Sequence, residues 1–463
     1  MADTAGAVTV TSTAGAITGA ITAAGDDRSA RGIASVIGRM ISAGQLGHGG
    51  RLPTVRELAR RLGVSPTTVS DAWRSLADVG AIEARGRNGT FVRRPTGAGL
   101  PRRYRRVTEG PGHFDLDLST GTPDPDLLPD LRPVVAAVSR QSLTSSYLDQ
   151  PVLPELAERL VADWPFPPEA LTVVDGAMDA LDRVAGQVVR LGDRVVVEHP
   201  AFPPVLDLLE RLGCEIVSVD VDEHGPLVEQ FRAALALGPT AVFLQPRAQN
   251  PTGSAITAAR VAELVDALAG SDTIVVEDDH ANEISSAPLV SLGKARPDRT
   301  VHVRSFSKSH GPDLRLAAVG GAGHVVTAVE NRRLLGPGWS SRILQSVLLE
   351  LLRSPEVDHT LETARNAYAN RRKLVSVVLT AGGVPHPEGD GINLWMRVAD
   401  ERAALVRLAA QGIGAAPGGP FMVRPDRDHL RITVGSIAAH DAERVAELLV
   451  DAAGHLPTSG GGR

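Results

Sequence analysis

Lysine is scarce in this sequence. The 463 residues include 45 arginines but only three lysines, Lys294, Lys308 and Lys373. Arginine stays protonated in proteins, whereas a lysine amine can lose its proton when desolvated and can then attack a carbonyl carbon. Lys308, in the stretch "RSFSKSHGPDLRLAAVGG", is therefore a candidate for imine chemistry. Lys294 and Lys373 have no comparable surroundings.

The chain has a single cysteine, Cys214, and therefore no internal disulfide. This fits a reducing, cytoplasmic compartment, and Cys214 itself is expected to be a small packed residue. The first 27 residues lack both a basic N-terminal region and a long apolar run. We therefore expect a disordered tail over residues 1–27, with no signal peptide and no membrane anchor. No spacing of His, Cys, Asp and Glu is typical of a metal site, so no metal is predicted.

Residues 107–463, which make up most of the chain, lack a net positive charge. From Arg28 to Arg106, sixteen arginines stand against four acidic residues, which gives a local net charge of +12. Residues 107–463 carry a net charge of −15. A basic segment attached to an acidic body indicates that only the first part of the chain meets a polyanion such as DNA, although a merely solvated basic face is the alternative.

A helix, a tight turn and a second helix are expected within the basic segment. In "LPTVRELARRLG", Thr54 can cap a helix that ends at Gly63. Ser65 can cap the next helix, which contains "PTTVSDAWRSLADVG". Near the start of that helix, Thr67 and Thr68 would face a major groove, as in a helix-turn-helix protein.

The following stretch, "AIEARGRNGTFVRRP", alternates apolar and polar residues on both sides of a turn that includes Gly89. This pattern is typical of a β-hairpin wing, which would bring Arg85 and Arg87 to phosphates or a minor groove. We expect a winged helix-turn-helix DNA-binding domain over residues 28–95. The Pro-, Gly- and Arg-rich residues 96–113 are expected to form a linker that is basic enough to lie along DNA.

Residues 114–456 alternate short apolar runs with helical stretches, and residues 457–463 are expected to be a flexible tail. Continuous apolar strands that alternate with helices indicate an α/β fold, with a mostly parallel sheet covered by helices on both faces. Ligands bind such sheets at the carboxyl ends of the strands. The expected strands are residues 171–175, 194–198, 215–221, 240–246, 273–278 and 300–306.

The residues that follow these strands could together hold one ligand. Phe202 is suited to stacking on a flat ring, Asp278 to pairing with a ring nitrogen and Asn250 to bonding a ring hydroxyl. Lys308 supplies an amine. Phosphate, aromatic ring, basic nitrogen, hydroxyl and aldehyde describe pyridoxal 5′-phosphate, so we predict that cofactor. Phe202 as ordinary core and His280, which follows the fifth strand, as a packed histidine remain open alternatives. The candidates for the phosphate are the Gly176 turn with the helix behind it, Ser305, Ser307 and Arg315.

The N-terminal stretch resembles the winged helix-turn-helix of GntR-type regulators. The resemblance rests on "LPTVRELARRLGVSPTTVSDAW", on Leu76 and Gly80, and on "GTFV" at residues 89–92. It implies that Arg56 contacts DNA. Pro66 departs from the family pattern, which usually has a polar or basic residue at this position.

The body resembles the fold type I, aspartate-aminotransferase-like enzymes. The resemblance rests on "SFSKSHGPDLR" at residues 305–315 and on the intact "NPTG" turn at residues 250–253. It implies that Tyr147, in "YLDQPVLPEL", reaches the phosphate of a neighbouring subunit, and hence a homodimer. It also implies that Arg431, in "HLRITVGS", grips a substrate or effector carboxylate. The fold would include a smaller C-terminal α+β subdomain.

Five residues depart from the aminotransferase pattern, and among them Ala317 and Val152 stand where glycine is usual. Ala177 and Met178 stand where polar side chains are usual, which leaves their backbone N–H groups to bind the phosphate. His280 replaces a tyrosine that bonds the ring hydroxyl in the related enzymes. We therefore expect weaker or altered cofactor binding, and we expect binding more than turnover.

The whole arrangement over residues 28–455 resembles the MocR subfamily of GntR-type regulators. This implies a homodimeric, cytoplasmic regulator that binds double-stranded operator DNA and no membrane. Its body would sense pyridoxal 5′-phosphate, or an amine or amino-acid effector, through an imine at Lys308. Two alternatives remain. One is a working aminotransferase with an ancillary DNA-binding module, and the other is a body that has lost the cofactor.

Overall fold

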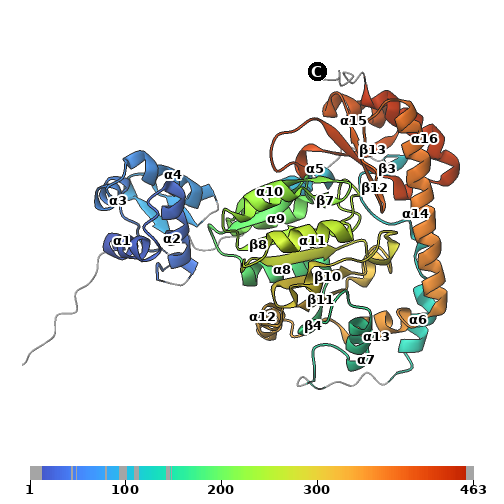
Figure 1. Cartoon of the computed structure of the whole chain (residues 1–463), viewed down its shortest axis with the longest axis horizontal. Helices are drawn as coiled ribbons and strands as arrows, with labels where there is room; N and C mark the ends of the chain where they lie inside the picture. The colour runs from blue at the N-terminus through green and yellow to red at the C-terminus, as the bar shows by residue number, and fades with distance from the viewer. Residues whose placement is uncertain are drawn as a thin grey trace, which may run out of the picture. The chain divides into compact units, whose positions relative to one another are not determined.

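The chain divides into two compact units, each with hydrophobic cores of its own (Figure 1). The first unit is made mainly of residues up to 92, and the second mainly of residues from 102 onward. The computed structural model describes residues 13–42, 45–47, 49–78, 81–92, 102–108, 114–141, 146 and 149–454.

The first unit is a winged helix-turn-helix. Its α3 is capped by the Thr54 hydroxyl, which accepts from the N–H of Glu57, and α3 ends at Gly63 in the left-handed conformation, with φ of 68°. Leu58 and Trp73 are buried in its core. The unit contains α1 (Thr13–Ala23), α2 (Ala30–Ser42), α3 (Val55–Leu62), α4 (Pro66–Asp78) and the antiparallel strands β1 (Ile82–Ala84) and β2 (Thr90–Val92).

Helix α1 corrects the expectation of a disordered tail over residues 1–27. Residues 13–23 are helical, and Ile17 and Ile21 are fully buried in the same core as α2 and α3. Two isoleucines four residues apart lie on one face of a helix, and their burial against neighbouring helices stabilises a segment whose Ala-, Thr- and Gly-rich composition predicts little by itself.

The second unit contains an eight-stranded mixed sheet in the order β4-β11-β10-β9-β8-β5-β6-β7. All six predicted strands are present, and β5, β8, β9 and β10 run parallel as expected. Strand β11 was not predicted and lies antiparallel between β10 and β4. The strands are β4 (Ala170–Val174), β5 (Arg194–His199), β6 (Glu215–Asp222), β7 (Gly225–Pro226), β8 (Ala241–Leu244), β9 (Ile274–Asp279), β10 (Thr300–Ser305) and β11 (Ala317–Gly321).

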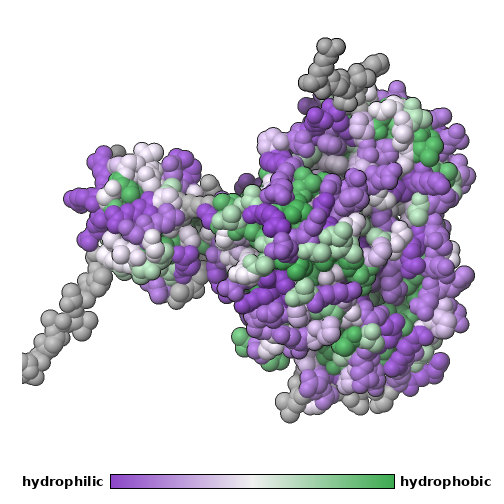
Figure 2. All heavy atoms as spheres, in the orientation of Figure 1, coloured by the Kyte–Doolittle hydropathy of each residue, from purple (hydrophilic) through white to green (hydrophobic). Residues whose placement is uncertain are grey.

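Helices pack against this sheet. On the face of the molecule drawn in Figure 2, patches of hydrophobic residues lie among hydrophilic ones. Helices α10 and α11 contribute to a core with strands β8 and β9, whereas α7 and α13 contribute to a second core with β4 and β11. The helices are α6 (Leu131–Val138), α7 (Pro154–Ala162), α8 (Ala177–Val188), α9 (Pro203–Leu212), α10 (Val228–Leu235), α11 (Ala258–Ala267), α12 (Gly323–Leu334) and α13 (Arg342–Leu351).

A smaller four-stranded sheet, in the order β12-β14-β13-β3, forms the expected second subdomain. The long helix α14 (Pro355–Ala381) joins it to the larger sheet, as Figure 1 shows. Leu361 of α14 lies in the α7 and α13 core, and Leu379 lies in the core of the small sheet. The remaining elements are β3 (Leu116–Leu118), β12 (Asn393–Arg397), β13 (Ile413–Pro417), β14 (His429–Thr433), α15 (Glu401–Ala410) and α16 (Ala442–Ala453).

Within the predicted linker over residues 96–113, Arg102–Thr108 form a short helix, α5. This helix packs against the second unit through Val107, which is 7% exposed. The linker segment is therefore partly folded onto the body.

Candidate effector site and DNA-binding surface

Three strands of the large sheet bring the predicted phosphate residues to one edge. The register places Ser305 of β10, Ala317 of β11 and Val174 of β4 in one row. Arg315 precedes this row and Gly176 follows it, because β11 runs opposite to β10 and β4. The sheet therefore gathers residues that are up to 139 positions apart in the sequence.

Lys308 and His280 contact each other directly. Lys308 Nζ lies 2.9 Å from His280 Nδ1, and His280 Nε2 lies 2.9 Å from the carbonyl oxygen of Ala248. Because a carbonyl oxygen only accepts, Nε2 carries the proton in the neutral ring and Nδ1 accepts from the lysine amine. Burial lowers the pKa of His280 to about 3, which keeps the ring neutral. Burial also lowers the pKa of Lys308 to about 8, so more of the amine is nucleophilic near neutral pH.

Asp278, at the end of β9, has an unused carboxylate oxygen. Gln245 Nε2 donates to Asp278 Oδ2 at 2.8 Å, while Oδ1 is buried without a hydrogen-bond partner among the described residues. Burial raises the pKa of Asp278 to about 6, although the charge of Lys308 acts in the opposite direction. Asn250 donates its backbone N–H to Gln245 Oε1 at 2.8 Å, and its own Oδ1 is likewise buried and unpaired within the described chain. These atoms suit a ligand that brings polar hydrogens.

The predicted phosphate end is built around a tight turn. Gly176 has φ of 100°, and a Cβ added to it would lie 3.1 Å from Arg315 Nη2, so the guanidinium lies close over this turn. Arg315 itself has φ of 49°, a left-handed conformation that costs a residue with a side chain about 1–2 kcal/mol. Helix α8 begins at Ala177, followed by Met178. Its first backbone N–H groups point toward this end of the site and favour an anion.

Two serines complete the predicted phosphate set. Ser305 is the last residue of β10 and is buried, whereas Ser307 is partly exposed. The N–H of Ser307 lies 3.3 Å from Ser305 Oγ, which accepts from it. Both residues therefore belong to the turn that leads into Lys308.

Arg431, on β14, is a buried cation with a free donor. It donates to the carbonyl of Ser119, and its guanidinium carbon lies 5.4 Å from the centre of the Phe421 ring. Its Nε has no partner within the described chain, and burial lowers the pKa of Arg431 to about 10. Its charge also acts to lower the pKa of Lys308, which is consistent with one shared site. This arrangement suits a ligand carboxylate.

Of the two remaining predicted cofactor residues, Phe202 and Tyr147, the structure describes only Phe202. Phe202 lies directly before α9, at the carboxyl end of β5, and is half-buried, so part of its ring is accessible to a ligand. Tyr147 lies outside the described residues, and its predicted role stays a prediction.

Gln245 and Arg247 are parts of the site that sequence reasoning missed. Gln245 bonds both Asp278 and Asn250, and Arg247 Nη2 lies 2.5 Å from Asp279 Oδ2 in a buried ion pair. Both follow β8. Because ligands bind parallel sheets at the carboxyl ends of the strands, the position of these two residues in the sequence already favoured a role in the site. What the sequence does not show is that β8 and β9 are adjacent.

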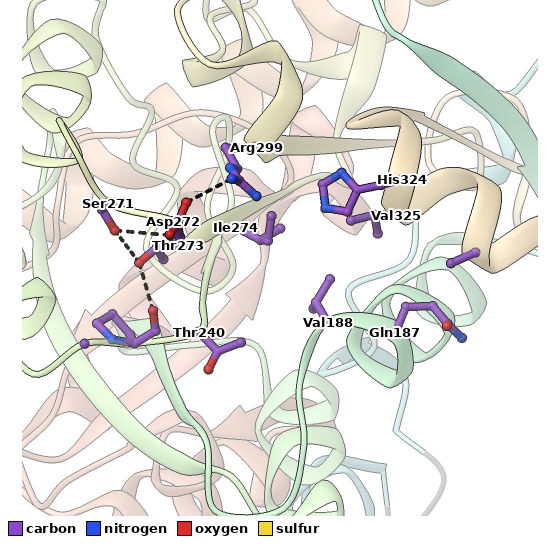
Figure 3. A pocket seen from close by; sticks show the side chains of 13 residues that line it. Gln187, Val188, Thr240, Ser271, Asp272, Thr273, Ile274, Arg299, His324 and Val325 are labelled. Atoms are coloured by element: carbon purple, nitrogen blue, oxygen red, sulfur yellow. Dashed lines mark hydrogen bonds and ion pairs between the residues drawn. The ribbon is translucent and has the colours of Figure 1, made fainter. Parts of the chain in front are cut away.

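A hollow of about 570 Å³ lies at the opposite edge of the same sheet, before β8, β9 and β10 (Figure 3). Four of its polar side chains are already paired with one another. Arg299 donates to Asp272 at 2.9 Å, and the hydroxyls of Ser271 and Thr273 lie 2.7 Å apart. Thr273 also donates to the carbonyl of Pro239 at 2.8 Å. This hollow therefore lacks the unsatisfied buried groups found around Lys308.

In the DNA-binding unit, two predicted contact residues also cap helices. Ser65 Oγ accepts from the N–H of Thr68 at 3.1 Å at the start of α4, and Thr54 caps α3. Arg56 and Thr67 are exposed on the first turns of α3 and α4. The first turn of α4 therefore presents a polar surface, as expected for a recognition helix.

In the wing, the side chain of Arg85 already contacts other residues of the wing. Arg85 Nε donates to Glu83 at 2.7 Å, and the guanidinium carbon lies 4.8 Å from the centre of the Phe91 ring. Gly89 has φ of 101°, and a Cβ there would lie 2.9 Å from Arg51 Nε. Arg51, which sequence reasoning missed, is thus a further cation at the wing. The side chain of Arg87 lies outside what the structure describes.

Among the described residues, no group of three or more His, Cys, Asp or Glu could hold a metal ion. In the same part of the chain, no helix is long and apolar enough to cross a membrane.

Comparison with known proteins agrees with the two units. Residues 29–92 match the family described as "Bacterial regulatory proteins, gntR family", and residues 115–450 match "Aminotransferase class I and II". The chain is 35% identical over 418 residues to the vitamin B6 salvage pathway transcriptional repressor PtsJ of Salmonella typhimurium, covering 89% of this chain and 95% of that protein.

Two further proteins are similar to this chain. The pyridoxine biosynthesis transcriptional regulator PdxR of Corynebacterium glutamicum is 28% identical over 379 residues, covering 77% of this chain and 80% of PdxR. The structure of the α-aminoadipate aminotransferase LysN from Thermus thermophilus, complexed with N-(5′-phosphopyridoxyl)-L-leucine, matches with a TM-score of 0.67 at 21% identity. That match covers 75% of this chain and 94% of LysN, and it shows the fold.

The fold and the matches define a helix-turn-helix transcriptional regulator with an aminotransferase-like domain. More particularly, the chain belongs to the MocR-type regulators within the GntR family.

Proposed function

We propose that this regulator holds pyridoxal 5′-phosphate at Lys308 and senses either the cofactor itself or an amine or amino-acid effector. The observation that carries the proposal is the Lys308 amine, which lies against a neutral His280 with its pKa lowered to about 8. It lies at the sheet edge where Asp278 keeps a buried, unpaired carboxylate oxygen.

The residues present fit the cofactor. Asp278 would accept a hydrogen bond from the ring nitrogen, Asn250 would bond the ring hydroxyl and Phe202 would stack on the ring. When bound, the cofactor supplies an aldehyde that can react with Lys308 and a ring that withdraws electrons. His280 holds the lysine amine in place. The phosphate would be held by the N–H groups of Gly176, Ala177 and Met178 and by Ser305, Ser307 and Arg315, with Tyr147 serving the other subunit of a homodimer.

An effector carboxylate would bind Arg431, whose buried Nε is still available as a donor. Binding of an amino acid would then compete with Lys308 for the aldehyde, and the change in the site would be passed to the DNA-binding unit. In the second form of the proposal, the cofactor alone is the signal. Operator contacts are assigned to Thr54, Arg56, Ser65, Thr67, Thr68, Arg85, Arg87 and Gly89.

The test is the visible absorbance spectrum of the purified protein titrated with pyridoxal 5′-phosphate. We expect a band from the lysine-bound cofactor that disappears in Lys308→Ala. The chain offers matched controls, because Lys294→Ala and Lys373→Ala remove the only other lysines, and both are exposed. A wild-type protein without the band, or a band that survives in Lys308→Ala, would contradict the proposed site.

A catalytically active aminotransferase with an ancillary DNA-binding module is the alternative, and the match to aminotransferases favours testing it. Sustained formation of a keto acid from an amino acid, in the absence of DNA, would support it. DNA affinity that depends on cofactor or amino acid would support the sensor. A DNA affinity that neither ligand changes would refute the sensor in both forms.

A further inference from the structure

Helix α5, which follows the DNA-binding unit in the sequence, is fastened to the second unit by its N-terminus. The Asp207 carboxylate accepts from the N–H of Arg103 at 3.1 Å and from the N–H of Tyr104 at 3.0 Å. A carboxylate at this position satisfies unpaired N–H groups and interacts favourably with the helix dipole. Asp207 belongs to α9, the helix that begins directly after the candidate stacking residue Phe202.

A second set of contacts fastens α5 to the small subdomain. Arg103 Nη1 donates to the carbonyls of Pro420 at 3.3 Å and Met422 at 2.7 Å. Val107 is buried in a cluster with Trp395 and Phe421. The helix thus contacts both parts of the second unit, α9 on one side and residues 420–422 on the other.

Phe421 lies between this helix and the candidate carboxylate-binding residue. Its ring centre is 5.4 Å from the Arg431 guanidinium carbon and 5.6 Å from the Trp395 ring centre. Its backbone carbonyl accepts from the N–H of Ala201 at 2.9 Å, directly before Phe202. The Tyr104 phenol of α5 is also close enough to act on the pKa of Arg431. The contact of Arg431 with Phe421, and the hydrophobic cluster that Phe421 shares with Val107, therefore connect the site to the helix.

We propose that α5 is the element through which occupancy of the effector site is passed to the DNA-binding unit. This inference rests on the proposed function, because it takes Arg431 as the residue that binds a ligand carboxylate. A carboxylate that draws the guanidinium toward itself weakens the contact between Arg431 and Phe421. The freed Phe421 then packs less firmly in the cluster that it shares with Val107, and α5 loosens. Only nine residues, 93–101, separate α5 from the last residue of the wing, Val92.

The first test is hydrogen exchange of the full-length chain with and without N-(5′-phosphopyridoxyl)-L-leucine, which combines the cofactor with an amino-acid carboxylate. The amides of Arg103 and Tyr104 are expected to exchange faster with the probe bound, since their bonds to Asp207 open more often. Binding is measured separately, as a rise in the melting temperature of the protein. If the probe binds and exchange over residues 102–108 is unchanged or slower, the inference fails while the proposed site stands. If the probe does not bind, the proposed site fails and the inference fails with it.

The second test uses variants that loosen α5 without touching the site. Asp207→Asn and Arg103→Ala should both speed exchange over residues 102–108 in the absence of the probe, while still binding it. On a duplex selected by the full-length protein from random-sequence DNA, the ratio of affinities with and without the probe should fall to about one in both variants. The exposed Arg102→Ala, one position earlier in the helix, should keep the wild-type ratio. Variants that bind the probe and retain the wild-type ratio would overturn the inference.

Discussion

The two ends of the candidate cofactor site are built by different means. At the ring end, side chains hold one another: Lys308 bonds His280, and Gln245 bonds Asp278. At the candidate phosphate end, the first N–H groups of α8, which begins at Ala177, join the side chains of Ser305 and Arg315. The ring end therefore depends on residue identity, whereas the phosphate end depends in part on the path of the backbone.

This difference explains at which positions the sequence can depart from the aminotransferase pattern with little loss of cofactor affinity. Ala177 and Met178 remove polar side chains but keep the N–H groups of the helix terminus. A change at Asp278 or Lys308 removes a charge or a nucleophile that no backbone group can replace. We expect substitutions at the ring end to have the larger effects.

The largest effect is expected for Asp278→Asn. Asparagine keeps the shape of the side chain but removes the negative charge that a protonated ring nitrogen needs. Hydrogen bonds to charged groups contribute about 1.5–3 kcal/mol, so affinity for pyridoxal 5′-phosphate should fall roughly 10- to 100-fold. Titration followed by visible absorbance measures this loss.

Glu198→Gln is the matched control for that variant. Glu198 is also a buried carboxyl at a strand end, and burial raises its pKa to about 8. It is therefore mostly protonated at neutral pH, and glutamine resembles this neutral form. We expect little change in cofactor affinity. If Glu198→Gln loses as much affinity as Asp278→Asn, then the loss reflects general disruption of the sheet edge, and the importance assigned to the charge of Asp278 is wrong.

A smaller effect, of opposite sign, is expected at the phosphate end. Ala177→Ser returns a hydroxyl to the first residue of α8, where it can donate to a phosphate oxygen. A net gain of about 0.5–1.5 kcal/mol corresponds to roughly 2- to 10-fold tighter binding. Gly186→Ser, farther along α8 where an added Cβ meets open space, should leave affinity unchanged. An unchanged affinity in Ala177→Ser would mean that the phosphate does not meet this turn.

Much of the fold could be predicted because its signals are local. The cap at Thr54, the stop at Gly63 and six apolar strands each occupy a few consecutive residues. Strand β11 could not be predicted in this way, since "AAVGG" at residues 317–321 contains small residues with weak strand preference, and it forms because two neighbouring strands pair with it. Helix α1 was missed for a similar reason, because its isoleucines matter only once a core is present.

The candidate site shows the same division. Lys308, Asp278 and Asn250 could be proposed because each lies at or after the carboxyl end of a strand. The bond between Lys308 and His280 could not, since it depends on how two loops 28 residues apart approach each other. The bond between Arg103 and Asp207, which lie 104 residues apart in the sequence, could not be predicted from the composition of the basic linker.

The smallest expected effect is a shift in the pH dependence of cofactor capture when a charged neighbour of Lys308 is replaced. Only the neutral amine attacks an aldehyde, and burial lowers the pKa of Lys308 to about 8, while Asp278 acts to raise it and Arg431 to lower it. Since the neutral form dominates above the pKa, the rate of cofactor capture should rise with pH, reach half of its maximum near pH 8 and level off at higher pH. His280 stays neutral throughout, because burial lowers its pKa to about 3.

Arg431→Gln tests this assignment. Removing the positive charge should make protonation of Lys308 easier, so the midpoint of the rate profile should move to higher pH, by less than about one unit. Stopped-flow absorbance between about pH 6 and 10 measures both profiles. Asp278→Asn should move the midpoint the other way, because it removes a negative charge that favours the protonated amine. Midpoints that coincide in all three proteins would show that neither charge acts on Lys308.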